Sequence, residues 1–423
     1  MRSLVEWLEQ QQRSHPKSID LTLSRVREVA RRLDLLTPDF RVITVGGTNG
    51  KGSTVACLDA MLRAAGVRCG RFTSPHLARY SERICVDGAE ADDVSLIEAF
   101  ERIDAVRADI TLTFFEYSAL AALDLFRRAR VEVAVLEVGL GGRFDATNII
   151  DADVAVVCSI GIDHVDWLGD TLEAIGREKA GIFRRGRPAV LGSADLPRSV
   201  WAAIEEVGAI PVVPGTHFRS SASGGTAATW NFEYGEFALR DLPRPALAGI
   251  HQLANAATAL AALTALGEVE LAHAKVTQAL RAVRLPGRFQ RVPGQVEWIF
   301  DVAHNVPAAQ GLAANLRTLP RARTIAVCGI LGDKDLHGIT AALSADIDSW
   351  VLVTLDGPRA LSTRELAQHL PADARILAHA PDVVAGCKVA RDAARSGDRI
   401  LVFGSFLTVG PALEFLGPEF VGL

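Results

Sequence analysis

One stretch limits what this chain can fold into more than any other. Residues 41–54 begin with an apolar, β-branched run, turn through four glycines around Lys51, and open into the helical pattern of residues 55–62. A strand, a glycine-rich turn, a lysine and a hydroxyl at the start of a helix form the layout of a phosphate-binding loop. Glycines let backbone N–H groups approach phosphate oxygens, and the helix N-terminus adds partial positive charge. The stretch therefore predicts an α/β unit that binds phosphate.

The match departs from the commonest form of this loop. That form has a leading glycine, four residues of any type, and then Gly-Lys-Ser/Thr. Here Val45 takes the place of the leading glycine, and Gly52 separates Lys51 from Ser53. The alternative is an ordinary glycine-rich turn with a solvated Lys51. Because a lysine between two glycines with Ser-Thr behind it is uncommon in such turns, we favour phosphate binding.

Length and composition narrow the class of protein. The 423 residues suggest two or three domains, and a net charge of −5 argues against a broad nucleic-acid surface. Residues 1–10 are acidic and amphipathic, unlike a signal peptide, and no apolar run approaches the roughly 18 residues of a membrane helix. The six cysteines form no C-x-x-C pair, which favours small buried side chains in a reducing cytosol. We therefore expect a cytoplasmic protein without nucleic-acid or membrane partners. A monomer is expected as well, although these features do not bear on it.

The first 285 residues are predicted to form one parallel-sheet domain. Near-continuous apolar runs at residues 131–139 and 153–160 are typical of parallel strands covered on both faces. Polar and apolar residues alternate within residues 209–242, which predicts an antiparallel excursion. The remaining expected elements are strands at residues 67–72 and 187–191 and helices at about 92–107, 114–129, 171–183, 251–266 and 271–283.

A second, smaller domain is predicted for residues 286–423. Pro286-Gly287 breaks the helical pattern and marks the boundary. Beyond it, β and α patterns alternate again, with strands expected at residues 296–302, 324–330, 350–355 and 399–403. The predicted fold class is therefore α/β, with a P-loop parallel-sheet ATPase domain followed by a smaller doubly wound domain.

Four polar side chains follow the ends of separate predicted strands in the first domain: Lys51, Ser74, Glu137 and His164. Ligands of open parallel sheets bind beyond the carboxyl ends of the strands, so one edge would carry all four. A site that uses ATP needs a phosphate cradle and hard ligands for Mg²⁺, which a hydroxyl, a carboxylate and an imidazole can supply.

These residues, and Lys179 on the helix expected at residues 171–183, also have purely structural interpretations. Glu137 could cap a turn, His164 could be a satisfied structural histidine, and Lys179 could be a solvated helix residue. A carboxylate that ends so apolar a strand is costly to leave unpaired, so we favour a metal at Glu137. From the residues alone, the chain is predicted to be a Mg·ATP enzyme whose reaction is not specified.

Further strings occur along the whole chain in the order and spacing of one family. They are Ser74-Pro75-His76-Leu77, Leu136-Glu137-Val138-Gly139-Leu140-Gly141-Gly142, Asp163-His164, Arg177-Glu178-Lys179-Ala180-Gly181-Ile182, His251-Gln252 with Asn255-Ala256, Pro286-Gly287-Arg288-Phe289 and Phe300-Asp301-Val302-Ala303-His304-Asn305. Together with Gly47-Thr48-Asn49-Gly50-Lys51-Gly52-Ser53, they resemble the folate branch of the Mur ligase superfamily, folylpolyglutamate synthase and dihydrofolate synthase. The resemblance implies an ATP-binding N-terminal domain and a smaller Rossmann-like domain, which acts as the glutamate ligase domain.

The resemblance also implies roles for single residues. The expected ATP contacts are Thr48, Asn49, Gly50, Lys51, Gly52, Ser53, Asn255, Arg288 and Asp301. Ser74 and Glu137 would bind one Mg²⁺, His164 would bind a second, and Lys179 would be carbamylated. The catalytic set would be Lys51, Lys179, His164 and Arg288.

Within the family, the chain resembles the bifunctional bacterial members. The expected dihydropteroate pocket is formed by Asp20, Leu21, Thr22, Leu23, Thr113, Phe114, Phe115, Glu116, Phe144, Asp145 and Ala146. A flat pterin and aminobenzoate need aromatic and apolar walls with a few polar anchors. His304 and Ser405 are expected near the glutamate or the phosphates. Two family strings differ here, as His304-Asn305-Val306-Pro307 and Gly404-Ser405-Phe406-Leu407-Thr408.

The implied reaction is amide ligation with ATP as co-substrate. The carboxylate of dihydropteroate or of a reduced folate would form an acyl phosphate, and L-glutamate would displace the phosphate. The alternatives are a folylpolyglutamate synthase alone, another Mur-type ligase, or a P-loop switch that binds nucleotide to regulate a partner. A switch would hold or hydrolyse nucleotide without needing glutamate.

Overall fold

The computed structural model describes residues 2–223 and 229–420, and the chain divides into two compact units. The first consists of Met1–Gly161, Asp166–Ala246 and Leu253–Val283. The second consists of Ile162–Val165, Leu247–Gln252 and Arg284–Leu423. A single boundary after residue 285 is predicted from the sequence, whereas two short earlier segments belong by their contacts to the second unit.

The first unit is built on an eight-stranded sheet with the strand order β4-β3-β2-β5-β1-β6-β7-β8. All neighbours from β2 to β8 are parallel, and β3 and β4 add an antiparallel edge. The strands are β1 (Arg41–Gly46), β2 (Cys69–Phe72), β3 (Ile84–Val86), β4 (Ala89–Glu90), β5 (Val133–Glu137), β6 (Val154–Val157), β7 (Pro188–Leu191) and β8 (Ile210–Val212). The central strand β5 is buried along its whole length, as its apolar run predicts.

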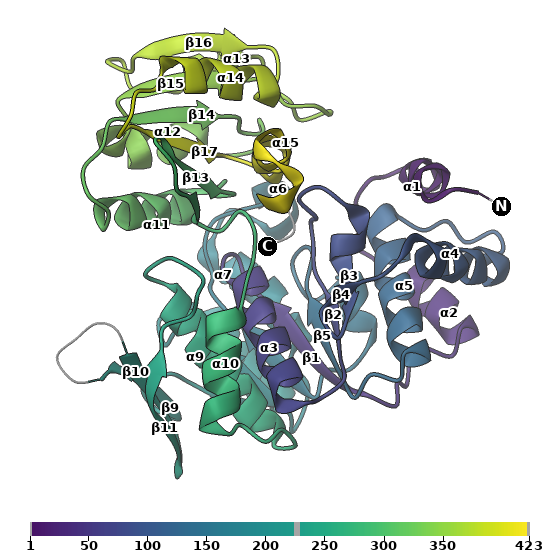
Figure 1. Cartoon of the computed structure of the whole chain (residues 1–423). Coiled ribbons are helices and arrows are strands. Elements are labelled where there is room, and N and C mark those ends of the chain that lie inside the picture. Colours follow the sequence, from purple (N-terminus) through teal and green to yellow (C-terminus); the bar gives the residue numbers. More distant parts are fainter. Residues whose placement is uncertain (1, 224–228, 421–423) are drawn as a thin grey trace. The chain divides into compact units, whose positions relative to one another are not determined.

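Helices cover both faces of this sheet (Figure 1). The helices of this part of the chain are α1 (Leu4–Arg13), α2 (Ser24–Arg32), α3 (Lys51–Ala65), α4 (Asp93–Arg107), α5 (Phe114–Arg128), α7 (Leu172–Lys179), α8 (Arg198–Val207), α9 (Gln252–Leu266) and α10 (His273–Ala282), with the short α6 (Val165–Leu168) between β6 and α7. Of these, α1 packs on α4 and α5, and α10 packs on α3. Val42 and Leu136 join the core under α1, α2, α4 and α5. Helix α3 packs against β1, β2 and β5 and lies beside α10 (Figure 1).

A separate antiparallel sheet follows β8, as the alternating residues predict. Its order is β11-β10-β9, formed by β9 (Phe218–Ala222), β10 (Thr229–Tyr234) and β11 (Phe237–Pro243). Trp230 and Phe232 point into its core and are fully buried. The predicted excursion begins too early, because residues 210–212 pair in parallel with β7 and extend the main sheet.

The second unit has its own six-stranded sheet, with the order β12-β13-β17-β14-β15-β16. All neighbours are parallel except β12, which runs antiparallel to β13. The elements are β12 (Gln290–Val292), β13 (Glu297–Asp301), α11 (Val306–Arg317), β14 (Thr324–Cys328), α12 (Leu336–Leu343), β15 (Ser349–Val353), α13 (Thr363–Ala367), β16 (Ile376–Ala380), α14 (Val383–Ala393), β17 (Arg399–Phe403) and α15 (Phe406–Leu416). Strands β12 and β16, which the sequence analysis missed, are edge strands with partly exposed residues.

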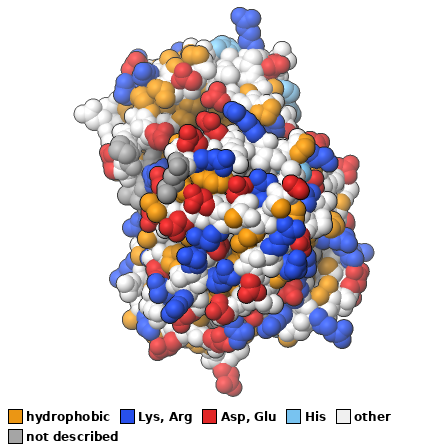
Figure 2. Space-filling model, turned by 90° about the vertical axis from the view of Figure 1, so that its right-hand side faces the viewer, with side chains coloured by type: hydrophobic (Ala, Val, Ile, Leu, Met, Phe, Trp, Pro, Cys, Tyr) orange, Lys and Arg blue, Asp and Glu red, His pale blue; other side chains and the backbone are white. Residues whose placement is uncertain are grey.

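Surface and core agree with the composition. All six cysteines are buried and unpaired. Within residues 2–223 and 229–420, no helix has the length and apolar character needed to span a bilayer. Figure 2 shows acidic and basic side chains interspersed over the face in view, without a broad basic patch there.

Candidate nucleotide and acceptor site

The loop between β1 and α3 has the backbone of an anion-binding turn. Helix α3 begins at Lys51, and Gly50 precedes it with a left-handed conformation, φ 88°. A Cβ at Gly47, where φ is 139°, would lie 3.1 Å from the backbone nitrogens of Cys158 and Ser159. Both glycines are therefore required by this path of the chain, since other residues would be strained there and Gly47 also allows a close approach to the end of β6.

The residues that follow β6 hold this loop in place. Thr48 donates its backbone N–H to the carbonyl of Ser159 at 2.7 Å, and Ser159 Oγ accepts from Asn49 N at 3.0 Å and donates to Asn49 O at 2.9 Å. Thr48 Oγ1 donates to Gly161 O and accepts from Gly161 N. The sequence analysis missed Ser159, although its position at the end of a predicted strand was a usable signal.

Two lysines converge on one backbone oxygen of the loop. Lys51 Nζ and Lys179 Nζ each donate to Gly47 O at 3.0 Å. Lys179 comes from the last residue of α7 and is 5% exposed. Asn255, on α9, lies against the other end of the loop, because a Cβ at Gly50 would be 2.8 Å from Asn255 Oδ1. Folding therefore brings Lys51, Lys179 and Asn255 together around one turn.

Ser74 and Glu137 meet at the carboxyl ends of the neighbouring strands β2 and β5. Ser74 N donates to Glu137 Oε2 at 3.2 Å, and Glu137 is 4% exposed. This contact places Ser74 next to a buried carboxylate, and hydroxyl and carboxylate oxygens are ligands that suit a hard divalent cation. Among the described residues, no group of three or more His, Cys, Asp and Glu side chains is arranged to hold a metal ion.

The predicted acceptor segments are joined by a polar network between α2 and α5. Arg25 donates to Thr22 Oγ1 at 2.7 Å and to Glu116 Oε1 at 3.0 Å, and Thr22 Oγ1 donates to Asp20 Oδ1. His15 contacts Asp20 Oδ2 at 3.3 Å. Glu116 also accepts from Thr113 N at 2.7 Å and so caps α5. Thus residues 20–23 and 113–116, far apart in sequence, lie side by side.

Aromatic rings continue this surface towards the turn after β5. The Phe115 ring lies 5.7 Å from the Phe72 ring, and a Cβ at Gly139 would clash with Phe115 Cζ at 2.6 Å. Asp145 accepts from the N–H groups of Gly139 and Leu140 and thereby closes this turn. Burial raises the pKa of the Asp145 carboxyl, against the effect of these hydrogen bonds. Phe144 is more exposed, with the Arg143 guanidinium 5.0 Å from its ring centre.

The second unit gathers another set of predicted residues. Asp301 Oδ2 accepts from Phe289 N at 2.9 Å, and burial raises the pKa of Asp301 although the Arg288 charge opposes the rise. The Arg288 guanidinium lies 5.0 Å from the Phe406 ring centre. Ser405 caps α15 by accepting from Leu407 N, which uses its hydroxyl oxygen in the fold.

Asp163, to which the sequence analysis gave no role, is the centre of a charged cluster in this unit. Lys334 Nζ donates to Asp163 Oδ1 at 2.6 Å, and Asn305 Nδ2 donates to Oδ2 at 2.9 Å. His304 Nε2 lies 3.6 Å from Oδ2, and His164 donates its backbone N–H to Oδ1. Burial alone would raise the pKa of Asp163, but the hydrogen bond from His304 and the charges of His164 and Lys334 hold it well below its usual range.

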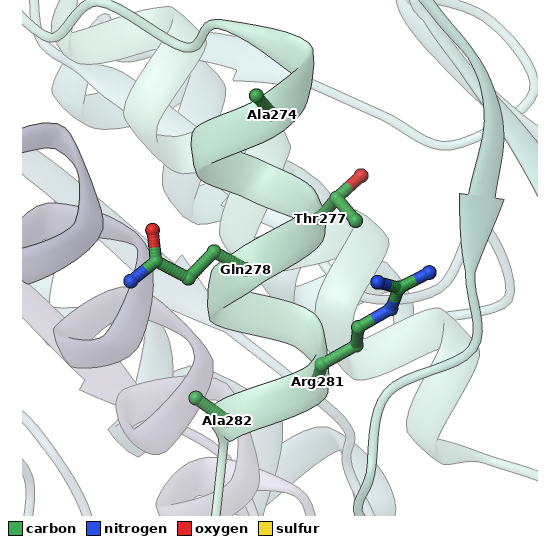
Figure 3. Close-up of a pocket in the computed structure, with 5 residues that line it drawn as sticks. All are labelled: Ala274, Thr277, Gln278, Arg281 and Ala282. Atoms are coloured by element: carbon green, nitrogen blue, oxygen red, sulfur yellow. The ribbon is translucent and has the colours of Figure 1, made fainter.

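A shallow depression on α10 is unrelated to these residues. Its volume is about 480 Å³, and its lining side chains project from one helix, as Figure 3 shows. They are Ala274, Thr277, Gln278, Arg281 and Ala282. None of them was predicted as a site residue.

Comparison with known proteins finds two family models that match successive parts of the chain. Residues 45–263 match the Mur ligase middle domain, and residues 287–406 match the Mur ligase, glutamate ligase domain. The chain is 43% identical to the dihydrofolate synthase/folylpolyglutamate synthase of Escherichia coli K12, over 98% of this chain and 95% of that protein.

Two solved structures extend the likeness to the fold. Escherichia coli FolC in complex with DHPP and ADP superposes with a TM-score of 0.93 at 43% identity, covering 99% of this chain and 98% of that one. The bifunctional enzyme of Yersinia pestis with AMPPNP and Mn ion has a TM-score of 0.90 at 44% identity, with 98% of both chains covered. The predicted fold class and family resemblance are thus confirmed, and the chain belongs to the dihydrofolate synthase/folylpolyglutamate synthase family of ATP-dependent Mur ligases.

Proposed function

We propose that this protein joins L-glutamate in amide linkage to 7,8-dihydropteroate and to reduced folates, with ATP as the source of energy. The observation that supports this most is the proximity, in one unit, of a phosphate loop, the Ser74–Glu137 pair and an aromatic surface at Phe114 and Phe115. The glutamate ligase domain over residues 287–406 supports the choice of the second substrate.

The phosphate loop would position ATP for the first step. The N–H groups at the start of α3 and the Lys51 ammonium would bind phosphate oxygens, and Asn255 would contact the nucleotide beside Gly50. The acceptor carboxylate oxygen would then bond to the γ-phosphorus as ADP leaves. The amine of glutamate would next attack the acyl carbon, releasing phosphate and a proton. Arg288, Asp301, His304 and Ser405 remain the proposed nucleotide and glutamate contacts of the second unit.

Ser74 and Glu137 are the proposed ligands of one Mg²⁺, and His164 of a second. A hydroxyl beside a buried carboxylate fits this hard cation, as the contact between Ser74 N and Glu137 Oε2 indicates. Bound Mg²⁺ would supply charge neutralisation for the phosphate oxygens.

We also propose that Lys179 is carbamylated on Nζ. Its ammonium is buried beside that of Lys51, and two cations on the same carbonyl oxygen repel each other. Carbamylation would replace one of them by an anion. The test is NMR after incubation with ¹³C-bicarbonate. We expect a carbamate signal in the native protein and in Lys275→Ala, a control lysine that also donates to a backbone carbonyl, and none in Lys179→Ala.

A coupled ADP assay separates this function from a P-loop switch. We expect ADP to form only when acceptor and L-glutamate are both present. Release of ADP at the same rate without either would favour the switch. The phosphate released from ¹⁸O-carboxylate acceptor should carry ¹⁸O, because the acyl phosphate passes that oxygen to phosphorus.

We further propose that the protein acts as a cytoplasmic monomer. The net charge of −5 and the buried, unpaired cysteines support a reducing compartment and no nucleic-acid partner. Light scattering of the eluting peak in size-exclusion chromatography should give the 45.2 kDa of a single chain.

A further inference from the structure

Arg83 is a buried cation that neither the motifs nor the proposed reaction uses. It is the last residue of the 3₁₀ turn Tyr80–Arg83, directly before β3, and only 8% of it is exposed. Its Nε donates to His76 Nδ1 at 2.7 Å. Since Nδ1 accepts this hydrogen bond, the nitrogen carries no proton, and this contact gives Arg83 no negative partner.

The turn that carries Arg83 is rigidly fixed. The Glu82 carboxylate accepts from the backbone N–H groups of Leu77, Ala78 and Arg79, at 2.7, 3.0 and 2.7 Å. Glu82 is therefore occupied as a cap and holds the segment between Ser74 and β3. As a result, the Arg83 guanidinium is positioned before any ligand arrives.

Besides His76, two aromatic rings lie beside the guanidinium. Its carbon lies 5.2 Å from the Phe114 ring centre and 5.7 Å from the Tyr80 ring centre. Tyr80 OH donates to Ser118 Oγ at 2.9 Å, which fixes the ring beside the guanidinium. Cation–π contacts stabilise a guanidinium but leave the N–H groups at its edge available for hydrogen bonds.

Arg399, the other arginine of the described residues that is buried, has a carboxylate partner, and Arg83 does not. Arg399 donates to Glu297 at 3.1 Å, and Arg71 lies 3.8 Å from Asp59. No carboxylate of residues 2–223 or 229–420 lies within 4.0 Å of Arg83. Burying a charge without a hydrogen-bonded counter-ion is costly, so an anion is expected at this place.

The neighbours of Arg83 indicate which anion this is. Phe114 is a wall of the proposed pocket for the flat acceptor, and Glu137, whose charge acts on Arg83, belongs to the pair proposed to hold Mg²⁺ near the γ-phosphate. The one acceptor group that must reach from the ring system to the γ-phosphate is its carboxylate. A guanidinium matches a carboxylate with two parallel N–H···O bonds.

We propose that Arg83 binds the acceptor carboxylate that is to be phosphorylated, and orients it towards the γ-phosphate of ATP. This inference rests on the proposed function, whose acceptor it needs. One carboxylate oxygen would bond to phosphorus while the other stays on Arg83. The guanidinium itself would neither gain nor lose a proton.

The test compares dihydropteroate with its carboxamide, which keeps the ring system but has no negative charge. Dissociation constants of both are measured by calorimetry in the full-length protein with a non-hydrolysable ATP analogue and Mg²⁺. The native protein should bind the acid about 10- to 100-fold more tightly than the amide, the range expected of a charged hydrogen bond. Arg83→Gln should bind both equally, through loss of acid binding alone.

Arg71→Gln is the matched control, since Arg71 is a half-buried arginine of the same unit that donates to Cys85 Sγ and lies 3.8 Å from Asp59. It should keep the preference for the acid whatever its stability. If Arg83→Gln does not fold, Arg83→Lys is measured alone. Its ammonium cannot hold both oxygens, so acid affinity should fall at least about tenfold with amide affinity unchanged.

An unchanged preference for the acid in Arg83→Gln, or in Arg83→Lys if that is the variant measured, would overturn the inference. So would an equal loss of acid and amide binding, which is the mark of a structural role. If the native protein bound neither dihydropteroate nor its carboxamide, the result would contradict the proposed function itself, and not only the role of Arg83. The two failures are therefore distinguishable.

Discussion

Lys51 and Lys179 bind the same backbone oxygen, Gly47 O, at equal distances of 3.0 Å. Lys51 is the first residue of α3, and Lys179 is the last residue of α7. Such a convergence of cations costs free energy unless anions share the place. The convergence is therefore a physical reason to expect an anion here, either the carbamate proposed on Lys179 or a phosphate oxygen.

Lys179→Ala or His164→Ala should leave the fold intact and remove most ligation. Loss of one preorganised electrostatic contact in an active site costs about 100-fold or more in kcat. Initial rates with dihydropteroate, with the unfolding midpoint as a check, measure this. Lys275→Ala, an exposed α10 lysine paired with Glu270, is the control and should turn over normally. Normal turnover by Lys179→Ala or His164→Ala would contradict the proposed metal site.

Asp163→Asn should destabilise the second unit, by about 1–3 kcal/mol at neutral pH, because Lys334 loses its buried counter-charge. The folded protein holds the pKa of Asp163 low, so the carboxylate stabilises the fold above its ordinary value of about 3.9, and the stabilisation is lost as pH falls towards the lower, folded value.

Urea unfolding of both proteins between pH 3 and 7 measures the effect. The stability difference between native and variant should be constant from about pH 5 upwards and should shrink below about pH 4. A difference that stays constant down to pH 3 would show that the charge of Asp163 contributes nothing.

At the scale of elements, the phosphate loop depends on where β1, β6, α3 and α9 meet. Gly50 and Gly66 provide a matched pair, since they flank the two ends of α3 with φ of 88° and 84°. A Cβ at Gly50 would meet Asn255 Oδ1 at 2.8 Å, whereas nothing lies within 4 Å of one at Gly66. The two positions share a backbone conformation but differ in what surrounds them.

Gly66→Ala should therefore cost about 1 kcal/mol of stability and leave the KM for ATP unchanged. Gly50→Ala should have a similar backbone cost and should also raise the KM for ATP about tenfold or more, because it displaces Asn255 from the loop. Unfolding free energies and ATP titrations of ligation measure both effects. Equal KM values for the two variants would separate Asn255 from nucleotide binding.

The strands that carry the site were predictable because parallel strands are long apolar runs, and their ends are where ligands bind. Lys51, Ser74 and Glu137 were predicted as site residues in this way, and they stay predictions. Ser159 and Arg83 were not predicted. Ser159 holds Asn49, which lies 110 positions earlier in the chain, and Arg83 contacts His76, which lies 7 positions earlier. The sequence does not show which buried cation lacks a carboxylate partner, because that depends on tertiary packing.

At the scale of the whole molecule, the chain combines a nucleotide-binding unit with a unit that matches a glutamate ligase domain. The boundary near residue 285 was predictable from Pro286-Gly287, which no helix continues through. The assignment of Ile162–Val165 and Leu247–Gln252 to the second unit was not, because it depends on contacts such as that between Asp163 and Lys334.

The mass of the product shows directly whether this protein adds glutamate to both acceptors. The protein is incubated with Mg·ATP and L-glutamate, with dihydropteroate in one reaction and a reduced folate monoglutamate in the other. Our account predicts a gain of one glutamate residue by dihydropteroate, and of one or more by the folate. A gain by the folate alone would reduce the claim to a folylpolyglutamate synthase, and no gain in either reaction would contradict it.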